Sequence, residues 1–217
     1  MKKQVPIRRT DTEPVQVGGM NDGIKRYYDQ NLERTVVKLI TGDCYTTAEP
    51  REMLVTILGS CISVCMRDPI ARVGGMNHFL LPGNTKNKLS KHDPGYSTRF
   101  GAYAMEELVN GLIKLGGLKE RFEVKIFGGG NVINNSAMIG TKNAKFAKEY
   151  LQKEGFTIAS EDVGGDYPRR IHYFPDTGKL MMRKLHRKED MQVAEEEKQY
   201  QNKLKVEDTS KEAAELF

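Results

Sequence analysis

Apolar residues along the chain fall into short runs of strand length, several of which alternate with polar residues. In CISVCM, residues 61–66, the side chains of Cys61, Ser63 and Cys65 share one face, and the intervening apolar side chains share the other. The Gly-Gly pair in the run 73–82 indicates a bulge or a close approach of another segment. Strands are predicted at 36–47 (a strand and its exit), 53–58, 61–66, 73–82, 122–127, from 156 onwards, 169–174 and 179–185.

Two longer segments have the spacing of amphipathic helices. The segment 103–117 ends at Gly116-Gly117, and 141–155 has Thr141 as a candidate N-cap and Gly155 as a candidate C-cap. The apolar face of the first helix is formed by Met105, Leu108, Val109, Leu112 and Leu115. The order of elements favours a mixed α-β domain with two main helices rather than a doubly wound parallel sheet.

The ends of the chain lack this periodicity. Residues 1–33 are interpreted as an N-terminal extension, 34–186 as the folded domain, and 187–217 as a charged tail that is flexible or forms a marginal helix. Between the predicted strands and the first helix, 83–99 has the composition of a long loop. The sequence PDTG, with Gly178 at its end, is typical of a turn between the last two strands.

Composition narrows the classes of function. The 217 residues contain no apolar run of the roughly 20 residues that span a bilayer, and the N-terminus lacks the apolar part of a secretory signal, so we expect a cytoplasmic protein without membrane insertion. Three cysteines are too few for a disulfide framework, and their spacing does not indicate a metal site. The net charge is +5, and the tail carries −3, so the rest of the chain is basic. No nucleic-acid-binding motif accompanies the basic residues, and we do not expect nucleic acid as a partner.

A thiol and an imidazole are predicted to meet in the hairpin formed by 61–66 and 73–82. If 68–71 form the turn, Cys61 lies directly opposite His78, with Cβ atoms about 4.5–5.5 Å apart. An imidazole can take the proton of a thiol and return it to a leaving group, and the Gly59-Ser60 bend could aim the backbone N–H of Cys61 at an oxyanion. Cysteine is, however, also among the most buried residue types, so a purely structural Cys61 is the alternative interpretation.

Other candidates have weaker support. Cys65 is interpreted as a core residue, Cys44 has no base nearby in the sequence, and His172 in the strand RIHYF is a reserve candidate for the base. His92 and His186 lie in polar surroundings. The sequence GGGN at 128–131 lacks the spacing of a nucleotide-binding loop, which favours a tight turn or a glycine wall beside the thiol.

Several of these segments together resemble the CheD family of chemoreceptor glutamine deamidases. They are LGSCISVCMRD, GGMNHFLLP, FGGGN, IGTKN and YPRRIHYFPDTGKLMMRKL, and they extend in order from about residue 36 to 185. The resemblance implies an α+β fold, a mixed β-sheet sandwich with two main helices similar to that of deamidating bacterial toxins. It implies Cys61 as the nucleophile and His78 as the general base. It implies Thr56, in LVTILGSC, as the third member of the triad.

The resemblance further implies that chemoreceptor glutamines become glutamates with release of ammonia, by way of a thioester and without a cofactor. Its implied partners are methyl-accepting chemoreceptors and, in some organisms, a CheC-type phosphatase. Two alternatives remain: a non-catalytic adaptor that binds the receptor or the phosphatase, and a methylesterase or protease with the same Cys-His chemistry.

Overall fold

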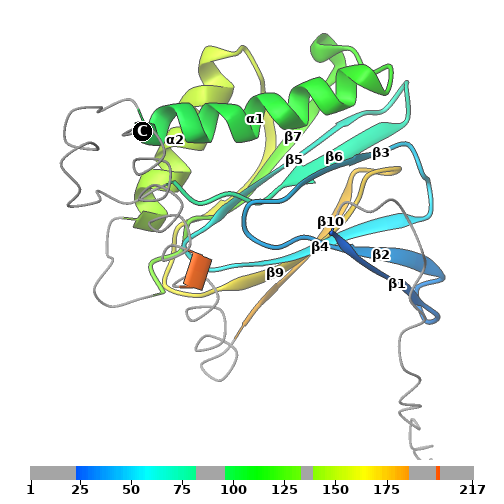
Figure 1. The fold of residues 1–217 in the computed structure, drawn as a ribbon, viewed down its shortest axis with the longest axis horizontal. Helices are drawn as coiled ribbons and strands as arrows, with labels where there is room; N and C mark the ends of the chain where they lie inside the picture. The colour runs from blue at the N-terminus through cyan, green and yellow to red at the C-terminus, as the bar shows by residue number, and fades with distance from the viewer. Residues whose placement is uncertain (1–22, 82–95, 133–138, 186–198, 201–217) are drawn as a thin grey trace, which may run out of the picture.

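Two five-stranded sheets form the centre of the molecule, for which a computed structural model describes residues 23–81, 96–132, 139–185 and 199–200 (Figure 1). The first sheet has the order β1 (Lys25–Asp29), β2 (Arg34–Lys38), β4 (Glu52–Leu58), β9 (Arg169–Phe174) and β10 (Lys179–Lys184). The second has the order β3 (Cys44–Thr47), β6 (Val73–Asn77), β5 (Ile62–Asp68), β7 (Glu123–Gly128) and β8 (Ile158–Val163). The pairs β2/β4 and β7/β8 are parallel, and the other neighbouring strands are antiparallel.

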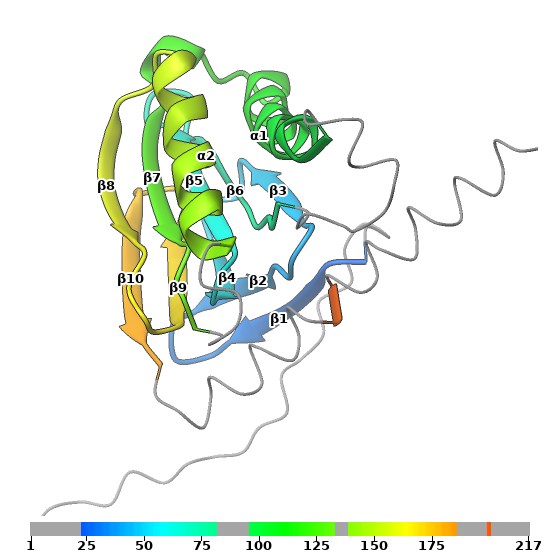
Figure 2. The ribbon, with the colours of Figure 1, turned by 90° about the vertical axis from the view of Figure 1, so that its left-hand side faces the viewer.

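Two helices cover the outer face of the second sheet, while its inner face packs on the first sheet (Figure 2). They are α1 (Tyr96–Lys114) and α2 (Ile139–Lys153), and a short 3-10 helix, η1 (Lys119–Arg121), lies between them in the chain. The alternation in β5 explains the layers, because Ile62 and Val64 join the core under the helices, whereas Cys61 and Cys65 join the core between the sheets. The predicted α+β sandwich with two helices is confirmed.

The helix boundaries differ from those predicted. Helix α1 begins at Tyr96, so the predicted loop is wrong over its last residues, and positions 83–95 lie outside the described residues. Its buried face is as predicted except for Leu115, which is 41% exposed because the helix has ended at Lys114. Helix α2 begins at Ile139, so Thr141 is not its N-cap. None of the helices in the described ranges is long and apolar enough to cross a membrane.

The run 36–47 is two strands rather than one. It contributes β2 to the first sheet and β3 to the second, and residues 40–43 cross between the sheets. Strand β1 lies within the segment interpreted as an N-terminal extension and pairs with β2, so the end of that segment belongs to the sheet. The predicted tail lies outside the described residues apart from Gln199 and Tyr200.

The register of the β5–β6 hairpin is shifted by two residues from the predicted one. Asp68 pairs with Val73 and Cys65 with Met76, because Pro69 to Arg72 form a longer turn in which Arg72 has φ of 59°. Cys61 is therefore not directly opposite His78. A shift by two residues keeps every side chain on its original face, whereas a shift by one would have moved His78 away from the thiol.

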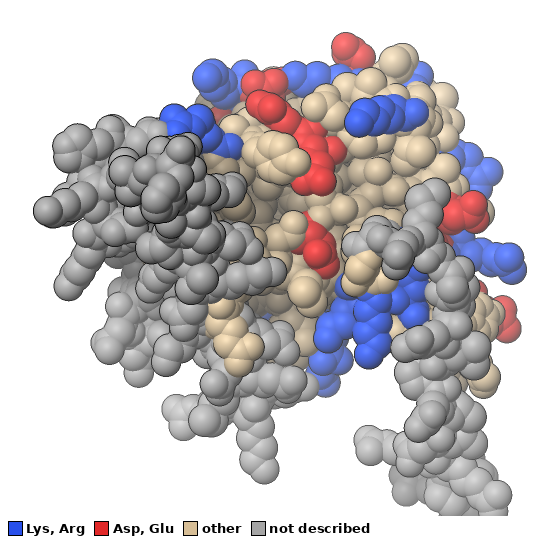
Figure 3. All heavy atoms as spheres, in the orientation of Figure 1, with Lys and Arg blue, Asp and Glu red and all other residues tan. Residues whose placement is uncertain are grey.

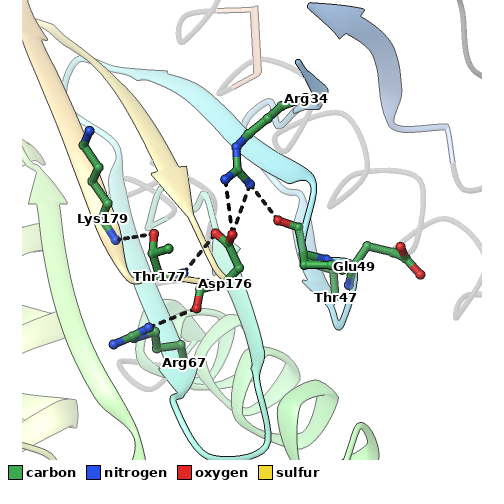
Figure 4. Close-up of polar contacts among 8 residues, drawn as sticks. Arg34, Thr47, Glu49, Arg67, Asp176, Thr177 and Lys179 are labelled. Carbon is green, nitrogen blue, oxygen red and sulfur yellow. Dashed lines mark hydrogen bonds and ion pairs between the residues drawn. The ribbon is translucent and has the colours of Figure 1, made fainter. Parts of the chain in front are cut away.

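The PDTG turn between β9 and β10 joins the two sheets at the end of β5 that is remote from Cys61. The Asp176 carboxylate forms an ion pair with Arg34 of β2 at 3.2 Å. The backbone carbonyl oxygen of Asp176 accepts a hydrogen bond from the side chain of Arg67 in β5, also at 3.2 Å (Figure 4). Gly178 has φ of 69°, as a turn that ends in glycine requires. This motif thus contributes to the scaffold rather than to the site described next.

Candidate active site

The site lies where two segments cross from the first sheet to the second. Strands β2 and β4 are parallel neighbours, so their C-terminal ends lie side by side at the same end of the first sheet. From there residues 40–43 lead to β3, and residues 59–61 lead to β5. Because both crossings start side by side, Thr41 and Cys61 come together although 20 residues separate them in the sequence.

Hydrogen bonds from two other elements hold the bend that carries Cys61. The backbone N–H of Gly129 donates to the Cys61 carbonyl at 2.6 Å, and that of Gly130 donates to the Gly59 carbonyl at 2.7 Å. The side-chain amide of Asn143 in α2 donates to the Ser60 carbonyl at 2.7 Å. Since three successive carbonyls are bound, the position of the thiol is fixed by the backbone around it.

The glycines of GGGN allow this close packing. Gly129 has φ of 64°, and a Cβ there would lie 2.8 Å from the Gly140 carbonyl oxygen at the start of α2. The fully buried Arg169 of β9 donates to the carbonyls of Gly128 and Gly164 and so fixes the start of the loop. The loop therefore has the structural role expected for it, beside the thiol. Sequence reasoning missed Asn143 and Arg169, because neither belongs to a catalytic motif.

His78 follows β6 and is fixed through its own backbone. Its N–H donates to the Asp43 carbonyl at 2.8 Å, and its carbonyl accepts a bond from the Gly42 N–H at 2.7 Å. Its ring lies between two threonines: Nδ1 is 2.7 Å from Thr56 Oγ1, and Nε2 is 3.2 Å from Thr41 Oγ1. The structure thus brings Thr56 within hydrogen-bonding distance of the imidazole.

The hydrogen bonds of Thr56 assign the tautomer of His78. The Thr56 hydroxyl donates to the Leu39 carbonyl at 2.9 Å, and a hydroxyl has only one proton to give. The contact with Nδ1 must therefore use the Nδ1–H as donor, which leaves Nε2 of a neutral imidazole as an acceptor. The ring presents its basic nitrogen on the side where Thr41 and Cys61 lie.

Burial keeps this imidazole neutral. His78 is 4% exposed, and desolvation lowers its pKa to about 3. Cys61 is fully buried, and a low-dielectric environment disfavours separated charges. The resting pair is consequently a neutral base beside a buried thiol.

The lowered pKa of His78 predicts how stability depends on pH. The unfolded chain binds a proton at His78 below about pH 6.5, whereas the folded chain does so only near pH 3, so the free energy of unfolding should fall as the pH decreases through this window. Denaturant unfolding of wild type and His78→Asn at about pH 8 and about pH 5 measures the effect, and the variant should lose less stability on acidification. His172→Asn is the comparison: burial lowers the pKa of this half-buried imidazole in the same direction, so its removal should abolish a smaller part of the loss than His78→Asn does. Equal losses in wild type and His78→Asn would contradict the prediction.

The other thiols and imidazole considered in the sequence do not join the site. Cys65 belongs with Cys61 to the core between the sheets, and burial there raises its pKa to about 12, which keeps its thiol protonated. Burial also raises the pKa of Cys44, which packs under the helices. His172 pairs with Val55 and so lies on the opposite face of the first sheet from Thr56. His92 and His186 lie outside the described residues.

Thr41 is a further residue of the site that sequence reasoning missed. Its Oγ1 lies 3.6 Å from Cys61 Sγ as well as 3.2 Å from His78 Nε2. The turn that presents it is closed by Asp43, whose carboxylate accepts the Ile40 N–H at 2.8 Å. The available signal was the Thr-Gly-Asp turn, which is recognisable as part of the site only once β2 and β3 are placed in different sheets.

Charge on the face shown in Figure 3 is mixed. Lys and Arg gather near β1 and β2, whereas Asp and Glu form a band that runs down from α1. The basic side chains of β1 and β2 include Lys25 and Lys38, which are directly paired across the two strands. On this face, the surface that could attract an acidic partner is therefore the part near β1 and β2.

Comparisons with known proteins agree on one family. The family model described as CheD, chemotactic sensory transduction, matches residues 80–184. A protein of Rhodopseudomonas palustris is 44% identical over 95% of this chain and 95% of its own, and one of Hahella chejuensis is 45% identical over 83% and 85%. A Saccharophagus degradans protein is 43% identical over 83% and 84%. All three are named as probable chemoreceptor glutamine deamidases, CheD.

Solved structures overlap with this fold only weakly. The Bacillus licheniformis hypothetical protein YfiH aligns over 57% of this chain and 50% of its own, with 13% identity and a TM-score of 0.34. This overlap supports no conclusion about the site. The match to the family model begins two residues after His78, so it does not include Thr56, Cys61 or His78.

Proposed function

Because the chain belongs to the CheD family, we propose that it is an amidohydrolase that converts chemoreceptor glutamines to glutamates, with Cys61 as nucleophile and His78 as base. The names of its relatives support the substrate and the reaction. The arrangement of the two side chains supports the mechanism: Thr41 Oγ1 contacts both Sγ and Nε2, and Nε2 is the unprotonated nitrogen. This shared position of the thiol and a neutral base is the observation that carries the proposal.

The reaction would proceed in two stages. The proton of the Cys61 thiol moves to His78 Nε2, and the thiolate attacks the amide carbon of the glutamine. The imidazolium then protonates the departing ammonia, which leaves a thioester. Water, deprotonated by His78, attacks the thioester, and the proton returns to the thiol as glutamate is released. This chain's residues require no cofactor for these steps.

Thr56 would act as the orienting member of the triad. By accepting the Nδ1–H, its oxygen keeps the second ring nitrogen unprotonated and aimed at the thiol. An aspartate in this role would stabilise the imidazolium by its charge, whereas a threonine provides only a dipole. The triad therefore favours a base that is charged only briefly during the reaction.

An ammonia assay tests the proposed function against its alternatives. Wild type incubated with a purified receptor cytoplasmic fragment should release ammonia in proportion to the glutamate formed, and the receptor chain should stay intact. Binding without ammonia would support the adaptor alternative. Cleaved receptor chains, or methanol released from methylated receptor, would support a protease or a methylesterase. Each of these three results would contradict the deamidase.

The proposed function also implies a cellular location and binding partners. A reaction on the signalling part of chemoreceptors would place the protein in the cytoplasm, with the receptor as its protein substrate. A CheC-type phosphatase is a further proposed partner. The basic side chains near β1 and β2 would favour an acidic receptor segment through long-range attraction.

A further inference from the structure

The Thr41 hydroxyl lies between the nucleophile and the base. Its oxygen is within hydrogen-bonding distance of Cys61 Sγ, at 3.6 Å, and of His78 Nε2, at 3.2 Å. Because Nε2 is an acceptor, the Thr41 O–H donates to it, and the lone pairs of the same oxygen are free to accept the Cys61 S–H. The three groups thus form a directed chain of hydrogen bonds from the thiol to the imidazole.

From this chain we infer that Thr41 is a catalytic residue that relays the proton between Cys61 and His78, an inference that rests on the proposed function. In the forward direction the S–H proton passes to Thr41 Oγ1 while the hydroxyl proton passes to His78 Nε2. The S–H and O–H bonds break, new O–H and N–H bonds form, and the threonine is unchanged at the end. The reverse transfer restores the thiol when the product leaves.

Burial of the thiol and the imidazole explains why a proton relay would favour the reaction. A thiolate and an imidazolium are both costly in surroundings from which water is excluded, and His78 in particular resists protonation because desolvation disfavours its charged form. A relay allows the proton to leave sulfur as the sulfur attacks, so that a separated ion pair need not form first. Without the hydroxyl, the thiol loses an acceptor that is already in place.

The backbone around Thr41 is fixed as a relay requires. The residues that follow it exchange backbone bonds with His78 itself, the Gly42 N–H donating to the His78 carbonyl and the His78 N–H to the Asp43 carbonyl. These two bonds hold the backbone next to Thr41 against the backbone of His78. Ile40, the preceding residue, is 59% exposed, so the same turn carries an apolar side chain on the outside of the molecule.

Two substitutions separate the hydroxyl from the shape of the side chain. Thr41→Val keeps the branched shape and removes the hydroxyl, and we expect kcat/KM for ammonia release to fall by about 10²-fold, the lower end of general acid–base effects. Thr41→Ser keeps the hydroxyl and should stay within a few-fold of wild type. The exposed Thr157, in Thr157→Val, is the matched control. Thermal unfolding of each variant shows that the fold is retained.

A relay also predicts an isotope effect that a structural role would not produce. The rate is measured in mixtures of light and heavy water. Its dependence on deuterium content should be that of two transferred protons in the wild type and that of one transferred proton in Thr41→Val. A Thr41→Val variant with wild-type rates would overturn the inference. So would an equally large loss in Thr41→Ser, because the hydroxyl would then not be the group that matters.

A second readout keeps this inference separate from the deamidase itself. The rate at which iodoacetamide alkylates Cys61 is measured over a range of pH in wild type, Thr41→Val and Thr41→Ser. Slower alkylation in Thr41→Val alone supports the relay even if receptors release no ammonia, in which case only the proposed function fails. Identical alkylation profiles in all three proteins would overturn the relay whatever the receptor assay shows.

Discussion

Cys61→Ala is expected to abolish ammonia release from chemoreceptors while leaving the fold unchanged. Loss of the nucleophile prevents the thioester from forming, and in well-studied hydrolases such a loss costs about 10⁶-fold in kcat. Cys61 is fully buried, and alanine removes only its sulfur, so the carbonyl bonds that hold the bend remain. Receptor binding should therefore persist without turnover.

Cys65→Ala is the matched control for this result. Cys65 lies four residues further along, in the same core between the sheets, and its thiol is held protonated because burial raises its pKa to about 12. The variant should lose a little stability through the small cavity and keep its activity. Full activity of Cys61→Ala, or equal losses in both variants, would contradict the assignment of the nucleophile.

Asp68→Ala is expected to destabilise the fold by about 3 kcal/mol, because backbone N–H groups that bond to this carboxylate lose their acceptor at a cost of about 1–3 kcal/mol each. The carboxylate is fully buried. One of its oxygens accepts the N–H groups of Ile70 and Ala71, and the other accepts the Leu118 N–H and the Arg121 guanidinium. The change therefore releases both the β5–β6 turn and the segment that follows α1.

The charge state of Asp68 supports this large effect. Burial raises its pKa, but the Arg121 guanidinium and the three backbone N–H groups outweigh burial and hold the pKa well below the usual carboxyl value. The stabilisation is thus fully present at neutral pH and is lost as the pH falls below the ordinary carboxyl pKa. Denaturant unfolding measures it, with Asp166→Ala, an exposed aspartate, as control. A difference between the two variants of less than about 1 kcal/mol would contradict this role.

The sequence predicted that Cys61 and His78 lie close together, but the argument for this was only partly correct. The assumed turn was too short, since Arg72 adopts a left-handed conformation and Asp68 pairs with Val73. The error amounted to two residues, which is the period of a strand, so His78 kept its face. Turn length depends on backbone conformations that the residue types there allow but do not require.

The part of the site that the sequence did not predict depends on long-range order. Thr41 reaches the thiol only because β2 and β4 are parallel neighbours that both cross to the second sheet. The Thr-Gly-Asp turn within 36–47 indicates an exit from a strand but not a crossing to a second sheet. Asn143 likewise binds the Ser60 carbonyl from a helix more than 80 positions away, and a single sequence does not indicate such a contact.

The measurement that tests the central claim most directly is peptide mass spectrometry of a chemoreceptor incubated with wild type or with Cys61→Ala. We predict that particular receptor glutamines gain the mass difference between an amide and an acid with wild type, in an otherwise intact chain, and remain unchanged with the variant. Glutamines that stay unmodified by wild type, or that are converted equally by Cys61→Ala, would contradict the account.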